Sequence, residues 1–257
     1  MTELSEVIVR KSSWKHWKLC PKLFDYVWIQ KLPSAPGVEQ QFGSMFHDGA
    51  RRFMEAMKDD NGAMLHGVKT WQEALSIFKG SLAFEHPVVG KWMANFFEFE
   101  AKRWQWLAER AAEPFKYWSP VAIEEEVLSK KKGYLMHIDR IDRLSDNNLI
   151  GIDYKTNKRM NPSDVRGELN FYCEGINTSG RFTERCTMVA CYNPQVNRVF
   201  VEPFKPRSLA YVERIIHQCR LNILSGDFRP RPQRYCRYCS FNTKCLEAGV
   251  FDEEFVA

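Results

Sequence analysis

Several features that would assign a protein to a class at once are absent from these 257 residues. No apolar run approaches the roughly 18 residues that a membrane-spanning helix needs, so we expect no membrane partner. The first residues lack the basic segment and apolar core of a signal peptide, which predicts an intracellular, cytoplasmic protein. Internal repeats and low-complexity tracts are also missing, which leaves no sign of a repeat architecture.

A strong net charge is missing too. The formal charge is only +5, which permits a nucleic-acid partner but does not require one. Hydrophobic residues make up 44% and charged residues 27% of the chain, as in globular proteins. We expect no disulfide framework, because the eight cysteines of an intracellular protein are free thiols or metal ligands.

The pattern of hydrophobic residues changes at Pro120. Before it, aromatic residues recur at helical spacing, and after it short branched segments predict strands. No linker divides the chain, so we expect a single α/β domain over residues 1–257. Its parts are a helical lobe (1–118), a core (119–225) and a cysteine-rich segment (226–257). Strands are expected at 121–129, 134–145, 148–156, 187–193 and 196–204, and helices in the core at 162–177 and 208–226.

The segment LIGIDYKTNK ends an apolar strand with charged side chains. Asp153 and Lys155 are two positions apart and so share one face of the strand, while Tyr154 points to the other face. The preceding strand carries Asp139. A hairpin that turns at residues 145–148 brings Asp139 close to Asp153.

The two carboxylates of Asp139 and Asp153 repel each other unless a cation lies between them. A hard divalent ion, Mg²⁺ or Mn²⁺, usually fills that place. A lysine beside the ion can orient a water molecule or stabilise the charge that grows on a phosphate, so the pattern suits phosphodiester hydrolysis. The ordinary alternative is a solvated salt bridge at the end of a strand, because a lone Asp-x-Lys is common.

The motif IDRID followed by LIGIDYKTNK resembles the PD-(D/E)xK nuclease superfamily, and in particular its RecB-like branch. The resemblance implies a restriction-endonuclease-like core, which is a central mixed sheet flanked by helices. It implies that Asp139 and Asp153 bind the metal ion and that Lys155 is catalytic. It also makes the main-chain carbonyl of Tyr154 an additional ligand, while Asp142 matches a second acid of the motif without a metal role.

Two helical motifs fit the same branch. GSMFH supplies its G-x-x-x-H pattern, so the resemblance makes His47 a metal ligand, and an imidazole favours Mn²⁺ over Mg²⁺. A lone histidine is more often an ordinary core or surface residue. The branch also has Gln-x-x-x-Tyr after Asp-x-Lys, and ELNFY puts Glu168 and Tyr172 at these catalytic positions, one helical turn apart. Glutamate loses the amide donor, so Glu168 can pair with Lys155 instead.

The cysteines near the C-terminus form a C-x₂-C-x₅-C pattern of Cys236, Cys239 and Cys245, and Cys20 is the candidate for a fourth ligand. From spacing alone, zinc bound by four thiolates is the first choice. The set resembles the cysteines of the AddB nuclease and of the iron–sulfur CRISPR-associated exonuclease family. That resemblance implies a structural [4Fe–4S] cluster, with zinc as the alternative. Either metal would tie the two ends of the chain together.

Both ends of the chain combine cations with aromatic rings. Cations for phosphates beside rings for bases are typical of proteins that bind single-stranded nucleic acid. The alternative is a solvated basic face over a partly buried aromatic stripe. The candidate nucleic-acid-binding residues are Lys15, Lys18, Arg234, Tyr235 and Arg237.

The patterns and the resemblance together predict a metal-dependent DNA exonuclease that acts at single-stranded ends. They imply CRISPR spacer acquisition or DNA recombination and repair, in a prokaryotic or viral context. Partners would be CRISPR integration or recombination proteins, and the oligomeric state stays open. A non-catalytic DNA-end-binding adaptor with the same fold and cluster is the alternative, because Glu168 replaces glutamine. A structural zinc protein without a DNA role is a third interpretation.

Overall fold

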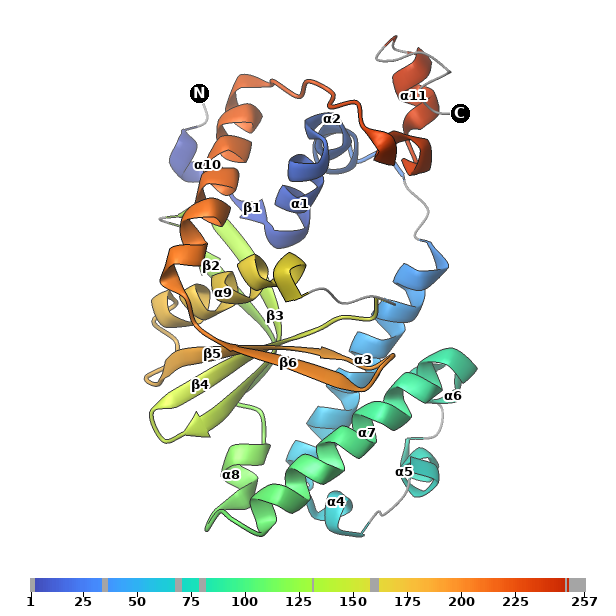
Figure 1. Ribbon diagram of the computed structural model, residues 1–257, viewed down its shortest axis with the longest axis vertical. Helices are drawn as coiled ribbons and strands as arrows, with labels where there is room; N and C mark the ends of the chain where they lie inside the picture. The colour runs from blue at the N-terminus through green and yellow to red at the C-terminus, as the bar shows by residue number, and fades with distance from the viewer. Residues whose placement is uncertain are drawn as a thin grey trace. The chain divides into compact units, whose positions relative to one another are not determined.

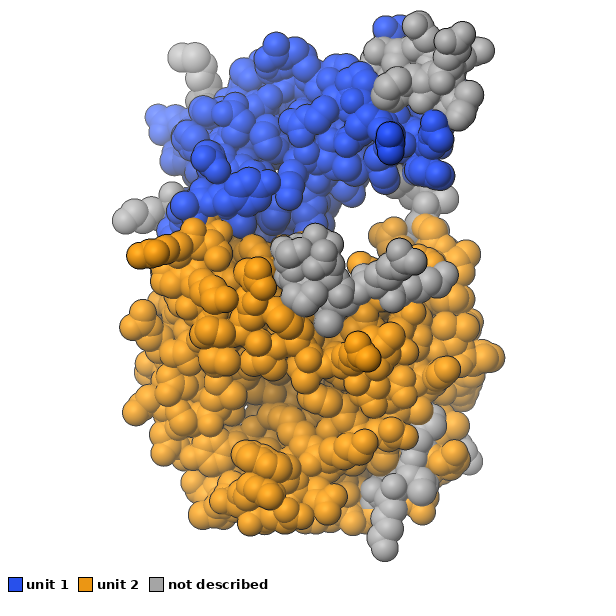
Figure 2. Space-filling view, in the orientation of Figure 1, with its two compact units in different colours: residues 1–35, 128–136, 210–257 blue, residues 36–127, 137–209 orange. Residues whose placement is uncertain are grey.

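The computed structural model (Figure 1) describes residues 3–33, 37–67, 71–78, 82–130, 132–157, 162–247 and 249. Its contacts divide the chain into two compact units, which Figure 2 shows in different colours. The chain passes between them four times, so each unit contains segments that are far apart in the sequence. That the chain forms a single domain stays a prediction. Unit 1 comprises residues 1–35, 128–136 and 210–257, and unit 2 comprises residues 36–127 and 137–209.

Six described strands build a mixed sheet: β1 (Val9–Arg10), β2 (Ala122–Ser129), β3 (Tyr134–Ser145), β4 (Asn148–Tyr154), β5 (Arg185–Asn193) and β6 (Arg198–Pro203). Their order is β1-β3-β4-β5-β6, and β2 also pairs with β3. The β4–β5 pair is parallel, whereas the β3–β4 and β5–β6 pairs are antiparallel. The central mixed sheet expected from the sequence is therefore confirmed.

The helices of unit 2 precede the sheet in the chain, apart from α9, which lies between β4 and β5, and a short turn after β6. None of the described helices is both long and apolar enough to cross a membrane. The helices are α3 (Val38–Asp59), α4 (Ala63–Gly67), α5 (Trp71–Ile77), α6 (Leu82–Glu85), α7 (Pro87–Ala108), α8 (Pro114–Trp118), α9 (Pro162–Thr178) and the 3₁₀ turn η3 (Pro206–Ser208).

Helices cover both faces of the sheet in unit 2 (Figure 1). On one face α9 packs against β4 and β5, and Gly151 permits this approach, since a Cβ there would lie 3.2 Å from Cδ1 of Ile176. On the other face the core is aromatic. Phe46 of α3 and Phe96 of α7 are fully buried, and each ring contacts Tyr154 of β4. The side chain of Tyr154 thus faces away from α9, as the strand alternation predicts.

Unit 1 joins the start of the chain to its C-terminal part. Its elements are η1 (Leu4–Glu6), β1 (Val9–Arg10), α1 (Lys11–Leu19), α2 (Pro21–Phe24), the π-helical segment η2 (Asp25–Ile29), α10 (Leu209–Ser225), η4 (Arg234–Tyr238) and α11 (Asn242–Glu247). β1 pairs in parallel with the first residues of β3. The buried guanidinium of Arg220 on α10 donates to the carbonyls of Val7 (2.8 Å) and Lys132 (3.1 Å). One arginine therefore links three distant segments of this unit.

Candidate active site

The hairpin of β3 and β4 sets the register that brings two aspartates together. Arg140 lies opposite Ile152. The ladder ends at this pair, and the next residue of each strand is an aspartate, Asp139 and Asp153, both of which are buried. The main-chain N–H of Tyr154 donates to Oδ2 of Asp139 at 2.6 Å. The hairpin predicted from the sequence is confirmed, with both acids on the face that α9 covers.

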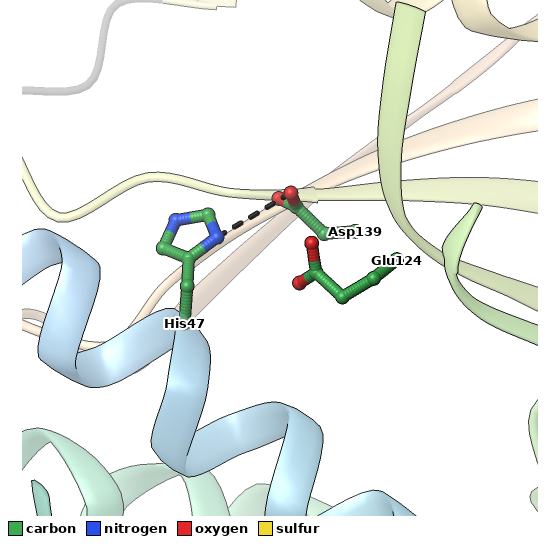
Figure 3. Close-up of side chains that lie close together, drawn as sticks. All are labelled: His47, Glu124 and Asp139. Carbon is green, nitrogen blue, oxygen red and sulfur yellow. Dashed lines mark ion pairs between the residues drawn. The ribbon is translucent and has the colours of Figure 1, made fainter. Parts of the chain in front are cut away.

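A histidine from α3 and a glutamate from β2 meet Asp139, as Figure 3 shows. Nδ1 of His47 lies 3.4 Å from Oδ1 of Asp139. In the described part of the chain, the ligand atoms of His47, Glu124 and Asp139 lie within 4.8 Å of one another. We call these three residues the acidic cluster. One imidazole and two carboxylates form a donor set that suits Mn²⁺ or Mg²⁺.

Glu124 is the member of the acidic cluster that no sequence motif indicated. The available signal was a run of three glutamates, Glu124–Glu126, inside a strand. The φ of Glu124 is 51°, a left-handed conformation that is uncommon for a residue with a Cβ. This backbone interrupts the regular alternation of the strand, so the direction of the side chain could not be predicted. On its other side Glu124 lies 3.3 Å from Nδ1 of His137.

The members of the acidic cluster shift one another's pKa. Burial lowers the pKa of His47, but the negative charges of Asp139 and Asp153 outweigh burial, and the pKa is raised. Burial and the nearby charge of Asp139 raise the pKa of Glu124. The raised pKa of both residues shows an excess of negative charge in the acidic cluster, which a bound cation would relieve.

Lys155 follows β4 directly and lies beside Asp153. Its Nζ is 2.5 Å from Oδ2 of Asp153 and 3.7 Å from Oε2 of Glu168 on α9. Tyr172, one turn later on α9, donates its hydroxyl to Oδ1 of Asp153 at 2.7 Å. Burial lowers the pKa of Lys155, but the charges of Asp153 and Glu168 outweigh burial and raise it, so the ammonium stays charged. The structure thus brings together four residues selected from the sequence.

Asp142 takes part in a buried ion network on the opposite face of β3. Its carboxylate lies 2.6 Å from Nε of Arg140 and 2.8 Å from Nη2 of Arg103. Glu100 of α7 lies 2.6 Å from Nη1 of Arg140. Burial raises the pKa of Glu100, but the two guanidinium groups outweigh burial and lower it. These charges tie α7 to the sheet and are separate from the acidic cluster.

A cavity of about 660 Å³ is lined by α7 and strands β3 to β6 on that same opposite face. Its wall includes Trp106 of α7, Tyr154 of β4 and Val201 of β6, but neither Asp139 nor Lys155. Chemistry at the two aspartates therefore does not take place in this cavity.

In unit 1, Cys20 and the three C-terminal cysteines of the C-x₂-C-x₅-C pattern line one cavity. Cys20 lies between α1 and α2, Cys236 in η4, Cys239 directly after η4, and Cys245 in α11. Among the described residues, the acidic cluster is the only group in which three or more His, Cys, Asp or Glu ligand atoms lie within 4.8 Å of one another. No three of the cysteine sulfurs are therefore that close together.

Main-chain donors point at two of these sulfurs. The N–H of Arg231 lies 3.4 Å from Sγ of Cys20, and the N–H of Gln233 lies 3.3 Å from Sγ of Cys236. Burial raises the pKa of the Cys239 thiol. Donors directed at sulfur suit thiolates, and a bound metal is what would deprotonate a buried thiol.

The candidate nucleic-acid-binding residues lie on α1 and η4 of unit 1. Arg231, just before η4, donates its guanidinium to the main-chain carbonyl of Lys18 at 2.5 Å, so the two ends of the chain lie side by side here. Lys15 is half-buried. The other candidates are exposed, namely Lys18, Arg234, Tyr235 and Arg237.

Comparison with known proteins gives a match over most of the chain. A family model described as the PD-(D/E)XK nuclease superfamily matches residues 12–246. No curated protein sequence matches the chain. Among solved structures, the chain is similar to that of a candidate exonuclease from Eubacterium rectale, at 13% identity and a TM-score of 0.48. That similarity covers 91% of this chain and 88% of the other.

Proposed function

The chain belongs to the PD-(D/E)XK nuclease superfamily, and on this premise we propose that it is a metal-dependent deoxyribonuclease. The observation that carries the proposal is the convergence of Asp139, Asp153 and Lys155 at the end of β4. Lys155 is charged and buried between carboxylates. Burial of a charge costs free energy. Such groups are found preferentially at functional sites, where a lysine can contact a phosphate.

The residues proposed to hold a divalent ion, Mn²⁺ or Mg²⁺, are the acidic cluster together with Asp153 and the carbonyl of Tyr154. The raised pKa of His47 and of Glu124 supports a cation site at this place. When bound, the ion supplies polarisation of the scissile phosphate and a lowered pKa for a bound water. The N–H of Tyr154 fixes Asp139 on its other oxygen, so the direction of this carboxylate is set before any ion binds.

Lys155 is proposed to orient the attacking water or to stabilise the negative charge that grows on the phosphate. Asp153 holds its ammonium at 2.5 Å, and the hydroxyl of Tyr172 holds Asp153 in turn. Glu168 lies farther from the ammonium, at 3.7 Å, and adds negative charge that keeps Lys155 protonated. Such a supported arrangement loses little free energy to reorganisation during the reaction.

We also propose that the four cysteines hold a [4Fe–4S] cluster with a structural role. Support comes from the cavity that all four cysteines line, and from the main-chain N–H groups directed at the sulfurs of Cys20 and Cys236. The choice of the cluster over zinc rests on the resemblance of the cysteine pattern. Stoichiometric zinc without iron in protein purified anaerobically would contradict this assignment.

The proposed reaction is exonucleolytic cleavage of DNA at single-stranded ends, inside the cell. The resemblance of the motifs supports a role in CRISPR spacer acquisition or in recombination and repair, with integration or recombination proteins as partners. The exposed cations of α1 and η4 support a nucleic-acid substrate.

A second candidate function is a DNA-end-binding adaptor without catalysis. Glu168 favours it, because a carboxylate 3.7 Å from Lys155 competes for the ammonium that a phosphate would need. The adaptor predicts binding of single strands with no metal-dependent product.

The test is a cleavage assay with single- and double-stranded DNA labelled at either end, in Mn²⁺, Mg²⁺ or EDTA. We expect metal-dependent products that disappear in Asp153→Ala and Lys155→Ala. Lys116→Ala is the matched control, because this exposed lysine of α8 forms ion pairs with surface acids such as Asp146, at 2.6 Å. Wild-type rates in Lys155→Ala would refute its catalytic role. A folded wild-type chain that binds DNA without cleaving it would favour the adaptor.

A further inference from the structure

An exposed tyrosine of α10 gathers two positive charges from different helices. Tyr211 is 49% exposed. The ammonium of Lys18, from α1, lies 5.3 Å from the centroid of its ring, and the guanidinium carbon of Arg214 lies 5.8 Å from it. Cations at such distances are attracted by the electrons of the ring. We call these three residues the Tyr211 cluster, and all three belong to unit 1.

Neither cation of the Tyr211 cluster forms an ion pair with a carboxylate of the described residues. Glu213, the acid next to Arg214 on α10, instead lies 2.6 Å from Nζ of Lys132. Two like charges gathered at one ring repel each other, and water only partly screens that repulsion. An anion bound at this place would relieve it, so the cluster has the charge of an anion site.

We propose that the Tyr211 cluster binds one nucleotide of single-stranded DNA, an inference that rests on the proposed function. The half-exposed ring offers a stacking surface for a base, and stacking of this kind tolerates any sequence. The two cations neutralise a flanking phosphate. In a duplex the bases are already stacked inside the helix, so only a single strand offers both a free base and a phosphate.

The surroundings of the cluster extend the positive charge. The guanidinium of Arg231 donates to the carbonyl of Lys18, so the segment that leads to η4 begins beside the cluster. Arg234 and Arg237 on η4 are exposed. Unit 1 as a whole has 16 Lys and Arg residues against nine Asp and Glu, a formal charge of +7. A field of this sign steers a polyanion towards the unit.

The test measures binding of a fluorescein-labelled oligo(dT) to the full-length chain by anisotropy. An Asp153→Ala background without added divalent metal prevents cleavage. Tyr211→Ala is expected to weaken binding roughly tenfold, the loss typical of one stacked base. Tyr211→Phe keeps the ring and is expected to bind as its parent does. Lys18→Gln and Arg214→Gln are each expected to reduce the slope of log Kd against log salt by about 0.7.

Trp106 on α7 supplies the matched control. Its ring is 56% exposed, and the guanidinium carbon of Arg110 lies 5.2 Å from the ring centroid. An exposed ring beside a guanidinium thus also occurs in unit 2, whose formal charge is negative, but there the guanidinium is paired with Glu109 at 2.7 Å. Trp106→Ala is expected to leave binding of oligo(dT) unchanged.

Unchanged binding in Tyr211→Ala, with normal circular dichroism and iron content, would overturn the inference. Equal losses for oligo(dT) and for a blunt duplex would also overturn it, because they would indicate contact with phosphates alone. Failure of the proposed function has a different signature. The wild-type chain would then give no metal-dependent product, while binding of oligo(dT) would still depend on Tyr211.

Discussion

The two units of the chain carry opposite charge. Unit 1 has 16 Lys and Arg residues against nine Asp and Glu, or +7, while unit 2 has 21 against 23, or −2. The +5 of the whole chain hides this division. The acidic cluster and Lys155 lie in unit 2, and the cysteine cavity and the Tyr211 cluster lie in unit 1. If the proposed functions hold, mutations in unit 2 should affect cleavage and mutations in unit 1 should affect DNA binding.

The units also differ in what their cations contact. In unit 2, Arg140 lies 2.6 Å from Glu100, and Arg166 lies 2.5 Å from Glu202. Such pairs use positive charge to hold the fold. In the described part of unit 1, Lys18 and Arg214 contact a ring instead of a carboxylate. The charges of Lys18 and Arg214 therefore remain available to a polyanion, whereas other cations of unit 1 are ion-paired, such as Lys132 with Glu213.

The largest expected effect comes from Asp139→Asn in unit 2. Removal of one carboxylate from the acidic cluster should lower the cleavage rate about a thousandfold, which corresponds to roughly 4 kcal/mol of barrier. Stability should change little, because the substitution also relieves repulsion between buried acids. Binding of oligo(dT), assigned to unit 1, should be unchanged. Single-turnover cleavage, urea unfolding and anisotropy measure the three quantities.

Asp142→Asn is the control for that experiment, three positions away on the opposite face of β3. It leaves Arg140 and Arg103 partly uncompensated, so we expect about 3 kcal/mol of lost stability. The protein that remains folded should cleave at the wild-type rate. A stable Asp142→Asn variant without activity would show that the two faces of β3 do not have separate roles.

The sequence was sufficient to predict the hairpin of β3 and β4 because its signals are local. Alternation along LIGIDYK puts Asp153 and Lys155 on one face, and the short turn at 145–148 fixes the register that brings Asp139 close to Asp153. Glu168 and Tyr172 came from the resemblance to the nuclease branch, and the spacing of one helical turn puts them on one face of the helix. The sequence also suggested the pairing of Glu168 with Lys155, and the structure contains it.

Other features depend on contacts or backbone conformations that no local pattern encodes. Glu124 joins the acidic cluster through a left-handed φ of 51°, which strand periodicity cannot reveal. Tyr211 meets Lys18 across almost 200 positions of sequence, so its position beside α1 required the fold. Spacing alone favoured zinc at the cysteines, and only the fold shows that Cys20 and the three C-terminal cysteines line one cavity.

The next largest effect is expected in unit 1 from Cys239→Ser. Loss of one ligand should remove the iron and lower the melting temperature by roughly 10 °C, about 3 kcal/mol for a chain of this size. Binding of oligo(dT) should weaken, whereas the affinity of unit 2 for Mn²⁺ should stay the same. Iron content, calorimetry and titration with Mn²⁺ test the three expectations.

Cys219→Ser provides the comparison, because Cys219 is a fully buried thiol of α10 outside the cysteine cavity. It should keep its iron and lose only the stability that a buried polar group costs. Retention of iron in Cys239→Ser would remove Cys239 from the ligand set.

A smaller effect on stability is expected when the pH is lowered, and the first loss should come from Glu100 in unit 2. The guanidinium groups of Arg140 and Arg103 hold the pKa of Glu100 below its usual value despite burial. The native state then binds fewer protons than the unfolded state, so this stabilisation is complete above the ordinary carboxyl pKa of about 4.3 and is lost as pH falls through the lowered pKa. The melting temperature should fall over that range, with a shallower slope in Glu100→Gln. An unchanged slope would rule out Glu100 as a source of acid sensitivity.

The smallest expected effect comes from Gly43→Ala, which tests how closely α3 approaches the end of β4. A Cβ on Gly43 would lie 2.9 Å from Oγ1 of Thr156, which follows Lys155, so one of them must shift. Gly43→Ala should gain up to about 1 kcal/mol of helix propensity, which offsets much of that strain in the melting temperature. Cleavage should nevertheless fall several-fold, because the shift reaches Lys155. Gly37→Ala, at the start of the same helix with no atom within 4 Å of its Cβ, should cleave normally. Equal rates in the two variants would mean that the end of β4 tolerates movement, and the position of Lys155 would then be less strictly set than its contacts with Asp153 and Glu168 indicate.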